Sequence, residues 1–423
     1  MDTQEIEKKT WDVVIIGTGM GGATIGYELA RAGLEVLFCE QGGDYLTSPA
    51  ALKGEFPEAI ARSEHTDIHD RLLQRAGRWD ERLLDATMDM PSDFRPLLGS
   101  GTGGSSALYG MVFERFFPGD FNPKESFPHA HDANLPENWP VTYSDLAPYY
   151  IAAEALYRVR ATHDPLRPVN EERAVLSPPP LSPANEELFD LFQAKGLHPY
   201  YLPMACEYKP GCQECLGILC PQCCKNDSAT ICLEPAVNSF GATLLTHCRA
   251  DYIDASQTAV HSVVCTWKQR KIRVSGQIIL VAAGAIGTPA LFLRSASAIW
   301  PSGLANHSDQ VGRNLMRHFL DYYLTYPLHS LTSDNLVKQI ALNDFYFIDD
   351  GKLGTLQSNG PLPPAAYVSQ GMRDKIQQKF MPFGALFHSR GLSLRQGIGS
   401  LRKARWFLHQ SLKICLMLRT ASP

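Results

Sequence analysis

The stretch that decides the fold is Val13-Val14-Ile15-Ile16-Gly17-Thr18-Gly19-Met20-Gly21-Gly22-Ala23. Its four consecutive β-branched residues predict a buried parallel strand. The strand runs directly into three glycines with the GxGxxG spacing of a dinucleotide-binding turn, Gly17, Gly19 and Gly22. In such a turn the first glycine makes the bend and the second lets the backbone approach a pyrophosphate. The third lets the next helix pack closely on the strand.

The residues after this turn complete a strand–helix–strand unit. We expect a helix from about Ala23 to Ala32, with its amide-rich N-terminus directed at the phosphates. The apolar run 36–39 predicts the second strand. Glu40 follows it, at a place where a carboxylate can accept hydrogen bonds from a ribose diol. A lone GxGxxG is a weak signal, but the full order of strand, turn, helix, strand and acid predicts a Rossmann-like α/β domain.

The composition limits the classes of protein to which the chain can belong. The chain has 423 residues, enough for two or three domains, and it is 44% hydrophobic and 20% charged, as is normal for globular proteins. A formal net charge of −5 gives no reason to expect a nucleic-acid partner. Residues 1–11 are polar and acidic, unlike a signal peptide, and glycine and proline interrupt the most apolar segment, 278–293. We therefore expect a cytoplasmic location and no membrane association.

A second glycine-rich stretch, residues 99–110, precedes an apolar and aromatic run at 111–117. Glycines and serines at this density cannot form a core. They predict a backbone loop that offers N–H and hydroxyl donors to a planar or anionic ligand. A flexible linker is the alternative, but the run that follows favours a buried element.

With these motifs in hand, the chain resembles the glucose-methanol-choline (GMC) family of FAD-dependent alcohol oxidoreductases. The N-terminal unit with Glu40 matches the ADP-binding unit of the family, and residues 311–315 are a weaker match near the end of the resemblance. The other matches are Gly103-Gly104-Ser105-Ser106, the stretch Trp139-Pro140-Val141-Thr142-Tyr143-Ser144-Asp145-Leu146-Ala147-Pro148-Tyr149-Tyr150 with Glu154, and Ala283-Gly284-Ala285-Ile286-Gly287-Thr288-Pro289-Ala290-Leu291. Together they cover residues 11 to about 325 in the order of the family.

The resemblance implies an α/β fold with two domains. A discontinuous, Rossmann-like FAD-binding domain would comprise residues 11–45, 95–125 and 225–310. A substrate-binding cap domain would comprise 46–94, 126–224 and 311–423. The implied cofactor-binding residues are Gly17, Gly19, Gly22, Glu40, Gly103, Gly104, Ser105, Ser106, Ala283, Gly284 and Thr288.

Two positions depart from the family pattern beside the GGSS loop. Members that bind flavin covalently have a histidine at the position of Leu108, and leucine cannot form that bond. The resemblance therefore implies FAD held without a covalent link. Tyr109 stands where the family usually has asparagine or histidine.

The implied reaction is hydride transfer from a CH–OH group of a small alcohol or sugar to flavin N5, while a histidine base takes the hydroxyl proton. The glycine-flanked histidine segment of the family is not found in residues 326–423, where His329, His388 and His409 have other surroundings. We therefore expect the fold to be C-terminally incomplete, and the catalytic residues stay unknown. A truncated, inactive FAD-binding remnant is the alternative function. The basic and apolar tail, 401–423, could be the end of a truncated chain, and a membrane-surface helix is the alternative interpretation.

Cysteines form the last pattern. Seven of the eleven lie between residues 206 and 232, and four of them have short spacings suited to zinc or an iron–sulphur cluster: Cys212, Cys215, Cys220 and Cys223. Disulfides and free thiols are the alternatives. Some bacterial multi-subunit members of the resembled family carry a cluster on comparable cysteines and pass flavin electrons onward. That likeness implies an electron-acceptor subunit as a partner.

Overall fold

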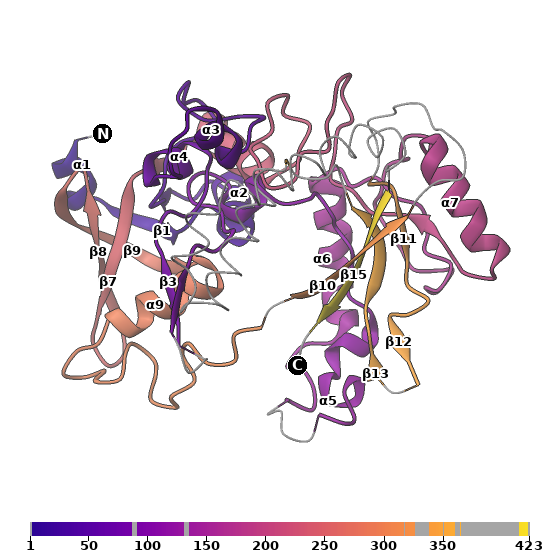
Figure 1. The fold of residues 1–423 in the computed structure, drawn as a ribbon. Helices are drawn as coiled ribbons and strands as arrows, with labels where there is room; N and C mark the ends of the chain where they lie inside the picture. The colour runs from indigo at the N-terminus through magenta and orange to yellow at the C-terminus, as the bar shows by residue number, and fades with distance from the viewer. Residues whose placement is uncertain are drawn as a thin grey trace. The chain divides into compact units, whose positions relative to one another are not determined.

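Contacts divide the chain into two compact units, which Figure 1 shows as a ribbon. The computed structural model describes residues 2–86, 91–130, 135–316, 318–325, 338–349, 351–359, 364 and 414–421. Unit 1 consists of Met1–Tyr109, Gly217–Cys223 and Asp227–Leu315. Unit 2 consists of Gly110–Leu216, Cys224–Asn226 and Met316–Pro423.

Unit 1 is built on a six-stranded sheet with the strand order β6-β2-β1-β9-β8-β7. The strands β1 (Thr10–Ile16), β2 (Val36–Cys39), β6 (Thr243–Leu245) and β9 (Arg270–Val281) run parallel. The strands β8 (Val260–Trp267) and β7 (Cys248–Ala255) extend the sheet as an antiparallel ladder. The predicted α/β class with a parallel sheet is confirmed.

The position of β1 in the sheet explains why the glycine turn that follows it lies where a ligand can bind. The chain leaves β1 through α2 (Met20–Arg31) to reach β2 on one side, while β9 pairs with β1 on the other side. The carboxyl end of β1 is therefore a topological switch point, where open α/β sheets bind ligands. Residues 13–16 of β1 are all buried, as the apolar run predicts.

Short elements surround this sheet. They are α1 (Thr3–Lys8), α3 (Pro57–Ser63), α4 (Asp70–Arg75), β3 (Leu83–Asp85), β4 (Ser92–Phe94), the 3-10 helix η1 (Gly104–Ala107), the π-helical turn η3 (Ala229–Leu233), α8 (Glu234–Asn238) and α9 (Gly284–Arg294). Among the described residues, no helix combines the length and the apolar character needed to cross a bilayer.

The unit boundaries differ in places from the predicted domain ranges. Residues 46–94, which we expected in the cap domain, belong to unit 1, and residues 110–125 belong to unit 2. Segment 46–94 is tied to unit 1 by backbone hydrogen bonds, such as Trp79 N to Leu98 O at 2.8 Å, and by the Arg78 guanidinium, which donates to Gly217 O at 3.1 Å. The part that each unit plays in cofactor and substrate binding stays a prediction.

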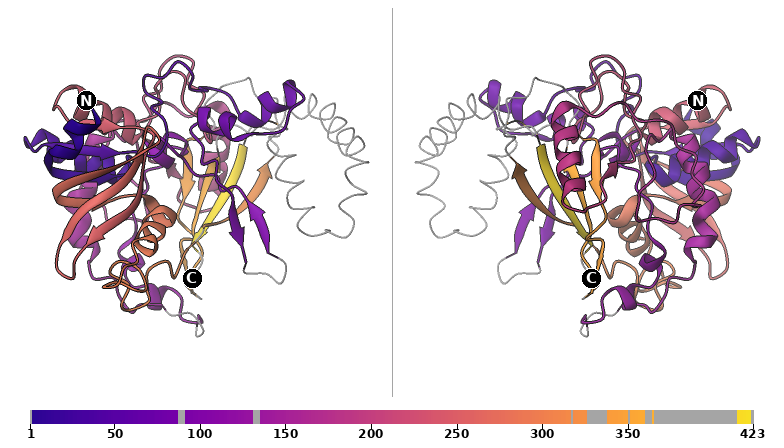
Figure 2. Two further views of the ribbon diagram at one scale, coloured as in Figure 1. Left: turned by 90° about the vertical axis from the view of Figure 1, so that its left-hand side faces the viewer. Right: turned by 90° about the vertical axis from the view of Figure 1, so that its right-hand side faces the viewer.

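Unit 2 contains a five-stranded sheet with the order β10-β15-β14-β11-β5. Its orange and yellow strands lie side by side in both views of Figure 2. Its strands are β10 (His318–Thr325), β15 (Ile414–Ala421), β14 (Thr355–Asn359), β11 (Ile340–Leu342) and β5 (Tyr200–Tyr201). The remaining elements are the 3-10 helix η2 (Pro118–Phe121), α5 (Pro123–Ser126), α6 (Tyr143–Leu156), α7 (Pro183–Ala194) and the hairpin of β12 (Phe347–Ile348) and β13 (Gly351–Lys352).

The strand β15 corrects one interpretation of the tail. It pairs antiparallel with β10 and β14 along its length, so a membrane-surface helix is wrong for residues 414–421. The run Ile414-Cys415-Leu416-Met417-Leu418 is continuously apolar. A short apolar run of this kind occurs in both strands and helices, so the sequence did not distinguish them. Residues 401–413 and the histidines His329, His388 and His409 lie outside the described residues.

The motif that ends at Glu154 has a structural explanation within unit 2. The side chain of Glu154, on α6, is 3% exposed and forms a bidentate pair with Arg115 at 2.7 and 2.8 Å. Arg173 donates to the same carboxylate at 2.8 and 3.0 Å, and the Ala174 amide donates at 3.0 Å. One carboxylate therefore joins three segments of the unit.

Candidate functional site

A cavity of about 620 Å³ lies in unit 1, at the carboxyl ends of β1 and β2. Its wall includes residues 17–21 of the glycine turn, Glu40, residues 104–106 of the second glycine-rich loop, and residues 282–284 after β9. This volume is within the usual range for small-molecule and cofactor sites. Three motifs that are far apart in the sequence therefore meet around one space.

Two glycines of the turn are required by close packing. Gly17 has a φ of +99°, and a Cβ built there would lie 2.6 Å from the carbonyl oxygen of Ala282. A Cβ on Gly22 would lie 2.1 Å from the carbonyl oxygen of Gly17. Any side chain at Gly22 would push α2 away from the turn, as expected for the third glycine of the motif.

Gly19 differs from these two glycines. It lines the cavity, and a Cβ built there would meet nothing within 4 Å. Its φ of −67° and ψ of −173° are open to any residue, so the fold itself does not require glycine. The missing side chain leaves room in the cavity at the N-terminus of α2. The N-cap residue, Gly19, has no side chain to cap this terminus, and the first amide groups of α2 lie at a space suited to an anion.

The Glu40 carboxylate holds the cavity wall together. Its Oε2 accepts hydrogen bonds from the amide and the hydroxyl of Thr18 at 3.1 and 2.7 Å. Its Oε1 accepts from the amides of Gly42 and Gly101 at 2.9 and 3.1 Å. Burial raises the pKa of Glu40, and these hydrogen bonds oppose that shift. The four donors fill the acceptor positions of a carboxylate, so contact with a ribose diol stays a prediction.

The GGSS loop is fastened to the glycine turn by a buried serine that the sequence did not single out. Ser228 is fully buried, and its amide donates to Ser106 Oγ at 3.0 Å. Its hydroxyl donates to Thr18 O at 3.2 Å. Ser106 Oγ also donates to Gly103 O at 2.7 Å, across the first turn of η1. These bonds give the loop a defined backbone conformation, and a flexible linker is wrong for it.

Eight of the predicted cofactor-binding residues line the cavity: Gly17, Gly19, Glu40, Gly104, Ser105, Ser106, Ala283 and Gly284. Gly22, Gly103 and Thr288 do not. Gly22 packs α2 on the turn, and Gly103 begins η1 in the left-handed region with a φ of +86°. A second part of the wall was missed, because no motif marks it: Trp79, Glu81, Leu83, Cys248, Arg249, Asp251 and Arg294.

Leu108 does not line the cavity. It packs with Ala107 and Leu219 in a small buried cluster, against Tyr45 and Ala51. An alkyl side chain in this position offers no nucleophile to a flavin. The observation agrees with a cofactor held without a covalent bond.

The cysteine-rich loop is divided between the units. Cys212 and Cys215 are buried in unit 2, and Cys206 lies beside Cys212 with 3.7 Å between the sulfur atoms. Cys220 and Cys223 belong to unit 1. Within the described part of the chain, three or more potential metal ligands gather only at Cys39, Cys248 and Cys265. Metal binding by the four loop cysteines stays a prediction.

Comparison with protein families gives one match over more than half of the chain. The model of the GMC oxidoreductases matches residues 86–320. A 6'''-hydroxyparomomycin C oxidase of Streptomyces lividus is 29% identical over 329 residues, covering 74% of this chain and 55% of the relative. A fructose dehydrogenase large subunit of Gluconobacter japonicus is 24% identical over 344 residues, covering 73% and 58%. The chain thus spans little more than half the length of these curated relatives.

Solved structures show the same fold. A pyridoxine 4-oxidase from Mesorbium loti superposes with a TM-score of 0.50 at 18% sequence identity, covering 84% of this chain and 69% of the oxidase. At this sequence identity, the similarity between the two structures shows a shared fold alone.

Proposed function

Because the chain belongs to the GMC oxidoreductase family, we propose that it is an FAD-dependent oxidoreductase acting on CH–OH groups of a small alcohol or sugar. FAD, the cofactor of this family, would occupy the cavity of unit 1. The observation that carries the proposal is the open space at Gly19, at the N-terminus of α2, where a pyrophosphate fits and where a side chain would occupy the room that the pyrophosphate needs. The names of two curated relatives, a 6'''-hydroxyparomomycin C oxidase and a fructose dehydrogenase large subunit, support this substrate class.

Different residues of the chain would bind different parts of FAD or hold the binding loops in place. The amides of α2 would bind the diphosphate, and Gly17 and Gly22 keep that helix close to β1. Glu40 and Ser228 hold the glycine turn and the loop at 99–106 in place. The GGSS segment would then position the flavin ring. When bound, FAD supplies the acceptor for the hydride of the alcohol C–H bond.

Turnover tests this function directly. The full chain loaded with FAD is expected to reduce an artificial electron acceptor when supplied with primary or secondary alcohols or sugars, at a rate that rises with substrate concentration and saturates. The matched control is the same preparation without substrate. Stoichiometric FAD with no turnover across the panel would overturn the enzymatic proposal and support the FAD-binding remnant.

Acid precipitation tests the mode of FAD attachment. Since Leu108 cannot form a flavin bond, precipitated holoprotein is expected to release all its yellow colour into the supernatant. Absorbance of the supernatant and the washed pellet gives the distribution. Colour that remains in the pellet after denaturation contradicts a non-covalent cofactor.

The partner and the metal content belong to the same proposal. A relative named as a large subunit supports an electron-acceptor subunit for this chain. The loop cysteines would then hold an iron–sulphur cluster or zinc, and anaerobically purified protein would contain iron and acid-labile sulphide in stoichiometric amount. Protein with neither iron nor zinc, and with thiols missing in pairs, would favour disulfides. A cytoplasmic location is the compartment that we propose for such thiol chemistry.

A further inference from the structure

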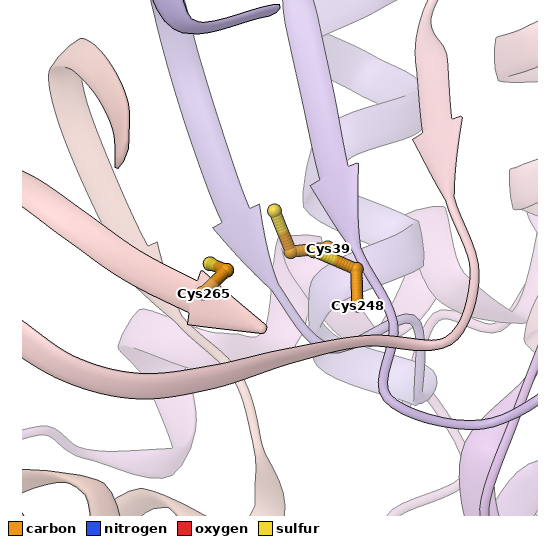
Figure 3. A group of neighbouring side chains, drawn as sticks. All are labelled: Cys39, Cys248 and Cys265. Atoms are coloured by element: carbon orange, nitrogen blue, oxygen red, sulfur yellow. The ribbon is translucent and has the colours of Figure 1, made fainter. Parts of the chain in front are cut away.

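Three buried thiols lie together in unit 1, away from the cysteine-rich loop. The sulfur atoms of Cys39, Cys248 and Cys265 are within 4.8 Å of one another. The three residues are at most 1% exposed. Figure 3 shows that their side chains come from three different strands. No sequence motif links them, since more than 200 residues separate Cys39 from the other two.

Backbone pairing fixes the positions of these thiols. Cys39 is the last residue of β2 and pairs with Ile16 of β1 and Leu245 of β6. Cys248 is the first residue of β7, and its amide donates to Glu40 O at 2.8 Å. Cys265 pairs with Ala250 across the β7–β8 ladder and with Ile272 on β9. Ligands carried by paired strands are held more precisely than ligands on loops.

The cluster also has an entry path. Cys39 and Cys248 are part of the wall of the cavity in unit 1, whereas Cys265 is not. In the apoprotein, a small ion could therefore reach the cluster from the cavity that we propose for FAD. All three cysteines also belong to the main apolar core of unit 1, so an ion would approach the cluster through the cavity wall at Cys39 and Cys248.

We propose that Cys39, Cys248 and Cys265 bind a thiophilic metal ion, of the class of Zn²⁺ or Cu⁺, as three thiolate ligands. Zinc–sulfur bonds of about 2.3 Å place neighbouring sulfur atoms about 3.8 Å apart in a tetrahedral site. The three sulfur atoms would need to approach one another by about 1 Å at most, a shift that we assign to rotation about the Cα–Cβ bonds. Soft thiolates without imidazole or carboxylate select Cu⁺ and Zn²⁺ over Mg²⁺ or Ca²⁺.

Metal binding by the three thiols balances in atoms and charge and involves no electron transfer. Three S–H bonds break, their protons go to the solvent, and three metal–sulfur bonds form. For Zn²⁺, three thiolates and one water molecule that enters with the ion would give a four-coordinate site with a net charge of −1. For Cu⁺ three sulfur ligands are sufficient.

Metal titration of the full, reduced chain tests the proposal. Metal-free protein is titrated anaerobically with Zn²⁺ and separately with Cu⁺, each against a chromophoric chelator, and the number of tightly bound equivalents is compared between variants. Cys265→Ser is expected to lose one equivalent per chain while retaining FAD, because Cys265 does not line the cavity. Cys232→Ser, at another buried cysteine of unit 1, is the control and is expected to keep the equivalent. The ion whose equivalent disappears identifies the metal.

A measurement on the unsubstituted chain covers the case in which Cys265→Ser does not fold. The protein is exposed briefly to a thiol-alkylating reagent at a mild denaturant concentration, with and without the ion, and the modified peptides are quantified by mass spectrometry. Protection of Cys39, Cys248 and Cys265 as a set of three, with Cys232 unchanged, supports the site. Equal alkylation of the three with and without either ion, or unchanged stoichiometry in a folded Cys265→Ser variant, would show three core thiols that only pack.

Discussion

Replacing Gly19 with valine is expected to lower the affinity for FAD by at least about 100-fold. Gly19 lines the cavity, and a Cβ built there meets nothing within 4 Å. The valine side chain would therefore enter the space at the N-terminus of α2, where we propose the pyrophosphate. The φ and ψ of Gly19 are accessible to valine, so the substituted chain is expected to fold with the same apoprotein melting temperature.

Fluorescence titration with FAD and thermal unfolding of the apoprotein are the two measurements. The matched control is Gly43→Ala, in the loop after Glu40. Its Cβ would lie 3.4 Å from Tyr45 Cε1, an ordinary contact, and Gly43 does not line the cavity. This control is expected to bind FAD like the parent chain. Retained FAD affinity in a folded Gly19→Val variant would show that the glycine turn does not hold the phosphates.

Glu154→Gln is expected to destabilise unit 2 by about 3–5 kcal/mol. The substitution keeps the side-chain volume but removes the charge that compensates two buried guanidinium groups. The side chains of Arg115 and Arg173 are 2% and 6% exposed, so neither can turn to water without disrupting the packing. Leaving a buried charge without its partner costs far more than the pair itself contributes.

Urea unfolding of the parent and variant chains measures this effect. The control is Glu137→Gln, also in unit 2, whose carboxylate pairs with Lys124 at 3.1 Å but is 78% exposed. Exposed pairs contribute little, so this variant is expected to differ from the parent by less than about 1 kcal/mol. A Glu154→Gln variant as stable as Glu137→Gln would contradict the proposed role of the buried pair.

Lowering the pH should reproduce this destabilisation in the parent chain. Burial alone would raise the pKa of Glu154, but the hydrogen bonds from Arg115 and the charge of Arg173 outweigh it and lower the pKa below the ordinary value. The ionised carboxylate therefore stabilises the fold above the unfolded-state pKa of about 4.3. That contribution is lost as the pH falls through the lower folded-state pKa. The stability difference between parent and Glu154→Gln should shrink over the same acidic range.

The sequence by itself determined the features that depend on neighbouring residues. The β-branched run at 13–16 and the glycine spacing after it predicted β1, the turn and α2, because strand burial and helix packing act over a few residues. The motif residues Glu40, Glu154 and the GGSS segment were also identified from the sequence. The family model agrees with the resemblance that these motifs carried.

Only the tertiary structure decided what those residues contact. Glu40 accepts hydrogen bonds from four donors on the glycine turn and the two loops beside the cavity, and Glu154 neutralises two arginines from distant segments. Neither partner set has a local signal. The thiols of Cys39, Cys248 and Cys265 meet because β2, β7 and β8 belong to one sheet, and strand order is set by long-range pairing. Spacing along the chain drew attention to the loop cysteines, whereas the buried thiol cluster depends on which strands pair in space.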